Sequence, residues 1–150
     1  MNTRNSIPAV RILPMSDKLD GFRGRDIADV QAKCFLRDLP RMHGRFHYPS
    51  VGLNAEPGTI VLFQYRARII ASATFLRDEK FDRPKRGCAG VLHFDPASFR
   101  TFDPVDVEGM RKAWRSFRAF GHVRQYLHPL RYPMFKKRLK HVTVPRSMMA

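Results

Sequence analysis

The stretch Arg45-Phe46-His47-Tyr48 places a cation, two aromatic rings and an imidazole next to one another. An aromatic side chain can stack on any nucleobase, and each stacked base contributes about 1–3 kcal/mol. A base held outside its helix also needs hydrogen-bond partners along its edge, and the side chains of Asn54, Gln64 and Ser72 carry suitable donors and acceptors. The candidates for a base-sized pocket are Arg45, Phe46, Tyr48, Asn54, Gln64, Tyr65 and Phe120. The alternative is that Phe46 and Tyr48 only anchor a long loop to the core.

The last third of the chain is the second region whose residues could do chemistry, because it is basic throughout. The 150 residues carry 28 Lys and Arg against 13 Asp and Glu, a net charge of +15. No acidic residue follows Glu108, whereas the segment 109–150 contains 11 Lys and Arg. A positive charge that is both large and localised indicates a partner such as nucleic acid or an anionic surface.

Phosphate contact is the simplest explanation for cations that have no acidic neighbours in the sequence, and it requires no particular base sequence. We expect it from Arg111, Lys112, Arg115, Arg118 and Arg124. The alternative is a solvated helix face that only keeps the protein soluble.

Few residue combinations suggest catalysis or metal binding. His43 and His47 are four residues apart, but a glycine lies between them and no third ligand is evident, so we expect no zinc site. His93 and Asp95 share one face of a predicted strand and could form an acid–base pair, although this aspartate precedes a proline and suits a turn. The sequence has no nucleophile elbow, phosphate loop or paired cysteines. We therefore expect no catalytic residues, no metal and no cofactor.

Length and composition predict one domain over 1–150, with a core over about 10–140 and a frayed tail over 141–150. We find no targeting signal and no apolar run that could cross a bilayer. Cys34 and Cys88 are far apart and form no metal-binding pair, which suggests reduced thiols in a cytoplasmic protein.

Hydrophobic spacing predicts the elements that position the first set of candidates. We expect a strand over 10–13, a loop over 16–25, a helix over 26–39 stopped by Pro40, a long connection over 41–58, and a hairpin of strands 59–65 and 68–76. A two-residue turn needs a positive φ at both central residues, so Arg66-Ala67 suggests a longer or bulged turn. Alternation places Gln64 on the apolar side of its strand, where an unpaired amide is costly.

The second half of the chain carries weaker signals. We expect a charged, solvated connection over 77–87, short strands over 89–94 and 98–102, a helix that Asp106 caps and Gly121 ends, and a short helix or strand over 134–139. Trp114 and Phe117 fall on the apolar stripe of the capped helix and are expected in the core. Phe120 and Tyr126 lie beyond that helix and are the better candidates for exposure.

The stretches "EPGTIVLFQYRARIIASATF" and "GVLHFDPASFRTFDP" resemble the barrel strands of the PUA-like superfamily, which includes EVE, ASCH and YTH-type domains. The segment "WRSFRAFGHVRQYLHPLRYPMFKKRL" looks like the end of such modules where they precede HNH-type nuclease domains in bacterial proteins. The resemblance covers roughly residues 43–140. It implies an α+β fold in which a small, strongly curved β-barrel is flanked by two or three helices. It also implies binding of RNA or DNA, with a modified base held near the loop that precedes the strand over 59–65.

Together these observations predict a non-enzymatic nucleic-acid-binding module, a possible reader of a modified base in DNA or RNA, whose partner chain supplies any cleavage. Two alternatives remain. The first is a small nuclease or hydrolase that uses His93 and Asp95. The second is a regulatory module whose positive field meets an acidic protein.

Overall fold

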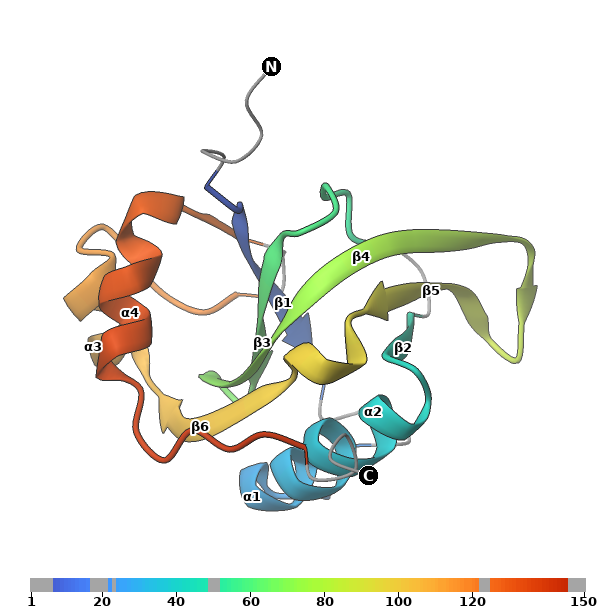
Figure 1. Cartoon of the computed structure of the whole chain (residues 1–150), viewed down its shortest axis with the longest axis horizontal. Coiled ribbons are helices and arrows are strands. Elements are labelled where there is room, and N and C mark those ends of the chain that lie inside the picture. Colours follow the sequence, from blue (N-terminus) through green and yellow to red (C-terminus); the bar gives the residue numbers. More distant parts are fainter. Residues whose placement is uncertain (1–6, 17–21, 23, 49–51, 122–124, 146–150) are drawn as a thin grey trace.

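The protein has a mixed α+β fold, seen in a computed structural model that describes residues 7–16, 22, 24–48, 52–121 and 125–145 (Figure 1). Its strands are β1 (Val10–Met15), β2 (Arg45–Tyr48), β3 (Ile60–Tyr65), β4 (Arg68–Lys85), β5 (Cys88–Phe94), β6 (Arg100–Val105) and β7 (Gln125–Leu127). One continuous helix is made of α1 (Ile27–Asp29), a π-helical part (Val30–Asp38) and α2 (Leu39–Arg41), and two short helices follow, α3 (Val107–Ala113) and α4 (Tyr132–Arg138).

The strands form one strongly bent sheet in the order β2-β5-β4-β3-β1-β7. β1 and β3 are parallel, and the other pairs are antiparallel. Because β4 is 18 residues long, one of its edges binds two partners: β6 along its first part and β5 along the rest. Among the described residues the sheet does not close on itself, since no pairing joins β2 to β7. The expected α+β class is therefore confirmed, whereas the expected closed barrel is not.

Two hydrophobic clusters cover the two faces of the central strands. Along β3, Val61, Phe63 and Tyr65 belong to one cluster, while Leu62 belongs to the other. The first cluster is covered by the long helix and contains Phe35, Phe75, Phe94 and Phe99. The second is covered by α3 and α4 and contains Phe102, Met110, Trp114, Phe117 and Phe135. The period-2 alternation predicted for this strand is thus confirmed.

The hairpin of β3 and β4 has the two-residue turn that the sequence argued against. Arg66 and Ala67 both adopt the left-handed conformation, with φ of 50° and 57°. The packed strands on either side impose this turn, because their register places Tyr65 opposite Arg68. A single irregularity in the pairing, between Phe63 and Gln64, lies near the end of the hairpin.

Several predicted boundaries were wrong. The strand predicted over 10–13 continues through Pro14 to Met15, and the connection predicted over 41–58 contains β2. The long helix continues through Pro40 to Arg41, because Pro40 stands in the first turn of α2, where a missing backbone N–H is tolerated. The segment 77–87, predicted to be a loop, belongs mostly to β4. The capped helix ends at Ala113 and not at Gly121, although Asp106 caps it as predicted and accepts a hydrogen bond from Gly109 N at 2.9 Å. Among the described residues, no helix is both long enough and apolar enough to span a membrane.

Candidate nucleic-acid interface

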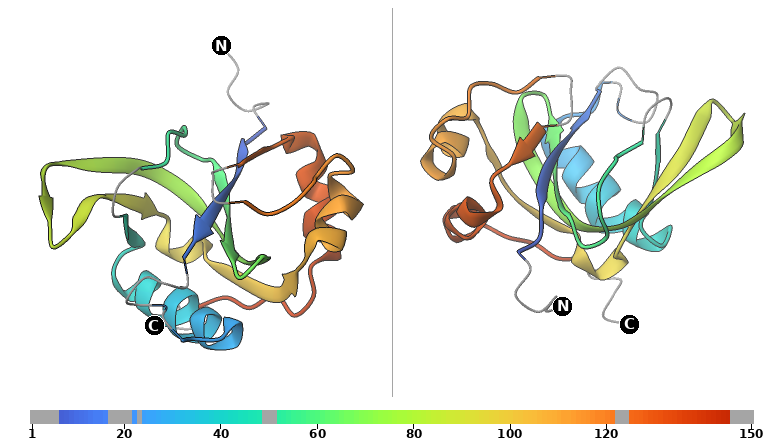
Figure 2. Two further views of the ribbon diagram at one scale, coloured as in Figure 1. Left: turned by 180° about the vertical axis from the view of Figure 1, so that it is seen from behind. Right: turned by 90° about the horizontal axis from the view of Figure 1, so that it is seen from above.

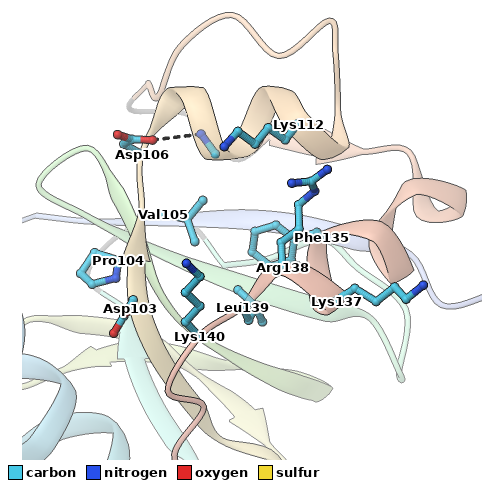
Figure 3. A pocket seen from close by; sticks show the side chains of 11 residues that line it. Asp103, Pro104, Val105, Asp106, Lys112, Phe135, Lys137, Arg138, Leu139 and Lys140 are labelled. Atoms are coloured by element: carbon cyan, nitrogen blue, oxygen red, sulfur yellow. Dashed lines mark hydrogen bonds between the residues drawn. The ribbon is translucent and has the colours of Figure 1, made fainter.

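An open pocket of about 420 Å³ lies between β6, α3 and the chain that follows α4 (Figure 3). Asp103, Pro104, Val105 and Asp106 form its β6 side, Gly109 and Lys112 come from α3, and Phe135, Lys137, Arg138, Leu139 and Lys140 come from α4 and beyond. We call the surface around this opening the α3/α4 surface and define it by its cations Lys112, Arg138 and Lys140. All three of these side chains are exposed.

The packing of the last third of the chain fixes where these cations stand. Phe135 is buried and its ring lies 5.3 Å from that of Trp114 and 6.2 Å from that of Phe102. The indole of Trp114 donates a hydrogen bond to the His128 carbonyl at 2.9 Å, and Arg131 Nε donates to the Ala113 carbonyl at 2.9 Å. The buried aromatic rings therefore hold α4 against α3, as expected for Trp114, and the cations project from this layer.

The chain after α4 runs along β6 and brings Lys140 to the pocket. Asp103 N donates to the Lys140 carbonyl at 2.9 Å, and Thr101 and Thr143 exchange two backbone hydrogen bonds of 3.0 and 2.8 Å. In Figure 3, Lys140 extends into the pocket from this side, while Lys112 and Arg138 extend over it from the two helices. Lys137 lines the opening but points away from it.

The positive charge of this surface is not cancelled by ion pairs. None of the salt bridges among the described residues involves Lys112, Arg138 or Lys140. The two carboxylates on the lining have other partners, because Asp106 caps α3 and Asp103 Oδ2 lies 2.9 Å from His141 Nδ1. Four cations against two occupied carboxylates leave the lining net positive. The lining therefore presents a net positive surface that suits an anion.

The residues predicted to contact phosphate occupy different positions in the structure and make different contacts. Lys112 lines the pocket. Arg111 instead holds the chain that follows α3: its Nε donates to the Phe117 carbonyl, its Nη2 to the Arg118 carbonyl, and its Nη1 pairs with Glu108. Arg115 and Arg118 are exposed, with no ion pair among the described residues, but they do not line this pocket. Arg124 lies outside the described residues.

The predicted base pocket is not assembled, because its residues lie on different faces of the sheet. The ring of Tyr65 is fully buried in the first cluster, and its hydroxyl donates to the Arg25 carbonyl at 2.7 Å and lies 3.0 Å from the Phe22 carbonyl. Tyr48 is also buried, and its hydroxyl donates to Asp78 Oδ1 at 2.7 Å. These two tyrosines therefore serve the core and do not wall a surface cavity.

The remaining candidates for that pocket are dispersed. On the other face, the Gln64 amide donates a hydrogen bond to the Gly121 carbonyl at 3.0 Å, which is a backbone partner of the kind expected for a buried amide. Phe120 packs on the ring of Phe117. Phe46 is half-buried against the phenylalanines of the first cluster, while Arg45 is exposed on β2. Asn54 is exposed in the loop before β3, where its backbone carbonyl accepts a hydrogen bond from Arg11 Nη1.

The two residues of the catalytic alternative have separate hydrogen-bond partners in the structure. His93 Nε2 lies 2.8 Å from Glu79 Oε1, while Asp95 caps a turn by accepting from Ala97 N at 3.0 Å. Within the described part of the chain, no three His, Cys, Asp or Glu side chains gather in a way that could hold a metal ion.

The pocket itself was not predicted from the sequence. Arg138 and Lys140 belong to the acid-free last third, which was the available signal, but nothing local indicated that they would face Lys112.

No protein-family model, curated protein or solved structure matches this chain.

Proposed function

We propose that this chain is a non-enzymatic nucleic-acid-binding module that holds backbone phosphates on the α3/α4 surface. The observation that supports this most is that Lys112 comes from α3, whereas Arg138 and Lys140 come from the end of α4 and the residues just after it, and that all three line one opening and form no ion pair among the described residues. Cations on a solvated helix face that serves only solubility would have no reason to converge.

A polymer fits this surface better than a single small anion. The opening is wide, and Arg115 and Arg118, in the segment that follows α3, are also exposed. A phosphate chain can contact such cations in succession, and each contact releases counterions, so that the binding energy accumulates along the strand. The PUA-like resemblance belongs to the same proposal: the sharply bent β4 and its two partners on one edge supply the curvature of such a fold, without the closure.

The proposal assigns no base pocket to the predicted residues, because they divide between the two faces of the sheet. Binding at the α3/α4 surface is then governed by phosphate spacing and not by base identity. If the bound nucleic acid is cut, the cleavage is supplied by another chain.

The test is a salt titration of binding by fluorescence anisotropy, with a labelled 20-bp duplex and the corresponding single strand. For the triple variant Lys112→Gln, Arg138→Gln and Lys140→Gln, we expect the log–log salt slope for the duplex to fall by about 2 to 3, since each phosphate contact contributes about 0.9. The matched control removes the same charge from the long helix through Lys33→Gln, Arg37→Gln and Arg41→Gln. Two of these cations already pair with carboxylates, namely Asp29 and Asp38.

Two results would contradict the proposal. A salt slope near zero for the unmodified protein excludes a contact dominated by phosphates. Equal slopes for the triple variant and the helix control show that only net charge matters and that the α3/α4 surface has no special role.

A further inference from the structure

The end of the β4–β5 hairpin projects from the body of the molecule as a two-stranded ribbon, which Figures 1 and 2 show from three directions. β2 covers β5 only from Gly90 to His93, so the residues 81–89 have no third strand beside them among the described pairings. We call the residues 80–89 the arm. Arg86 and Gly87 form its tip, where both residues adopt a positive φ, 51° and 78°, as a two-residue hairpin turn requires.

The arm is basic and exposed. Lys80, Arg83, Lys85 and Arg86 are all exposed and form no ion pair among the described residues, whereas Asp82 is the only acid within the arm. The acids at its base are occupied, because Asp78 accepts from Tyr48 and Glu79 lies against His93. Lys85 Nζ sits 4.8 Å from the centre of the Phe81 ring, which orders the cation without neutralising it.

The shape of the arm limits what it can bind. A two-stranded ribbon fits the major groove of B-form DNA, which is about 12 Å wide and 8.5 Å deep. The pairing within the arm is irregular, because residues 81–84 of β4 lie opposite Ala89 alone, between the pairs Lys80–Gly90 and Lys85–Cys88. The part of β5 beyond Gly90 extends about 7 Å at roughly 3.3 Å per residue, so only the tip of the arm enters the groove. The major groove of double-stranded RNA is too deep and narrow for side chains to read. A ribbon-shaped tip therefore favours the DNA duplex over the RNA duplex.

We propose that the arm inserts into the major groove of double-stranded DNA as a second contact, separate from the α3/α4 surface. The arm and the α3/α4 surface lie at opposite ends of the molecule along its longest axis (Figure 1). This inference rests on the proposed function and narrows its ligand to duplex DNA. Arg83, Lys85 and Arg86 contact the phosphates at the groove walls or the N7 and O6 atoms of guanine on its floor.

The experiment compares the triple variant Arg83→Gln, Lys85→Gln and Arg86→Gln with the α3/α4 triple variant and with the helix control described above. Each protein is titrated against a DNA duplex, an RNA duplex of the same sequence and the single-stranded DNA. Methylation of guanine N7 by dimethyl sulfate then reports on occupancy of the major groove, at a protein concentration that saturates each variant.

We expect the arm variant to lose at least fivefold in affinity for the DNA duplex relative to the helix control, and to match that control on the RNA duplex and the single strand. We expect guanine N7 to be protected by the unmodified protein and by the saturated α3/α4 variant, and to be unprotected by the arm variant.

Several results would overturn the inference. These are an unprotected N7 with the unmodified protein, full protection with the arm variant, or an equal loss on DNA and RNA duplexes. Self-association of the arm variant with unchanged DNA binding would also overturn it, since the cations would then serve only to keep the free strand edges from pairing. If the arm variant loses groove protection while the α3/α4 variant binds like the helix control, groove insertion by the arm is supported and phosphate binding on the α3/α4 surface is refuted. If the α3/α4 variant loses affinity while the arm variant keeps groove protection, phosphate binding on that surface is supported and groove insertion by the arm is refuted.

Discussion

Replacing Arg111 by glutamine tests whether this cation holds the chain or the ligand. Its Nε donates to the Phe117 carbonyl at 2.9 Å and its Nη2 to the Arg118 carbonyl at 2.8 Å. Glutamine is too short to reach both carbonyls, and a hydrogen bond from a charged group contributes about 1.5–3 kcal/mol. Because the side chain is 44% exposed, water replaces part of that contribution. We expect a loss of about 2 kcal/mol in the free energy of unfolding, which lowers Tm by about 4–8 °C in a chain of this length.

The neighbouring residue provides the control. Lys112 is exposed and has no ion pair among the described residues, so Lys112→Gln should leave Tm within about 2 °C of the unmodified protein. Urea unfolding followed by the fluorescence of Trp114, the single tryptophan, measures stability beside both sites, and anisotropy measures DNA binding. The reasoning is refuted if the Arg111→Gln and Lys112→Gln variants have the same urea midpoint and lose the same amount of DNA affinity.

Three further outcomes follow from the packing. Gly90→Ala should destabilise the fold by roughly 2 kcal/mol or more, because a Cβ there would lie 2.2 Å from the Tyr48 hydroxyl and 2.4 Å from the backbone oxygen of Glu79; urea unfolding measures it, and an unchanged midpoint would contradict this close packing. The hydrogen bond from His93 holds the pKa of Glu79 below its usual value, so this carboxylate stabilises the fold above the ordinary glutamate pKa and the stabilisation is lost as pH falls through the folded value. Glu79→Gln should flatten the pH dependence of unfolding in that acidic range, and an unaltered profile would show that the pair contributes nothing. Burial raises the pKa of Cys34 to about 12, so iodoacetamide at pH 8 should modify this thiol only after unfolding, as mass spectrometry would reveal.

The parts of the fold that could be predicted are those that local sequence features specify, namely the alternation of side chains along a strand and the residue that caps a helix. The hairpin of β3 and β4, the cap by Asp106 and the burial of Trp114 and Phe117 each depend on a few neighbouring residues. The end of α3 depends on distant ones, because the indole of Trp114 turns out of the helix to reach the His128 carbonyl. Such a contact has no signature in the residues around the helix.

The arm illustrates a second limit of the sequence. A ribbon that is exposed on both faces buries no apolar stripe, so its charged residues carry no period-2 pattern and resemble a solvated loop. The candidate base pocket failed for a related reason. Gln64 and Tyr65 are adjacent in the sequence, but adjacency in a strand places their side chains on opposite faces, and only the finished sheet shows which face is open.

The position of β1 between β3 and the edge strand β7 has a consequence for how the protein is made. β1 pairs on one side with β3 and on the other with β7, so its register joins residues 10–15 to residues 60–65 and to residues 125–127. A chain emerging from the ribosome can align β1 with β3 early, yet it leaves the other edge of β1 unpaired until β7 has been synthesised. The second hydrophobic cluster is complete only when Phe135 arrives. One edge of β1 therefore stays open until most of the chain has been made, and an open strand edge is where a partly folded chain is prone to pair with another copy.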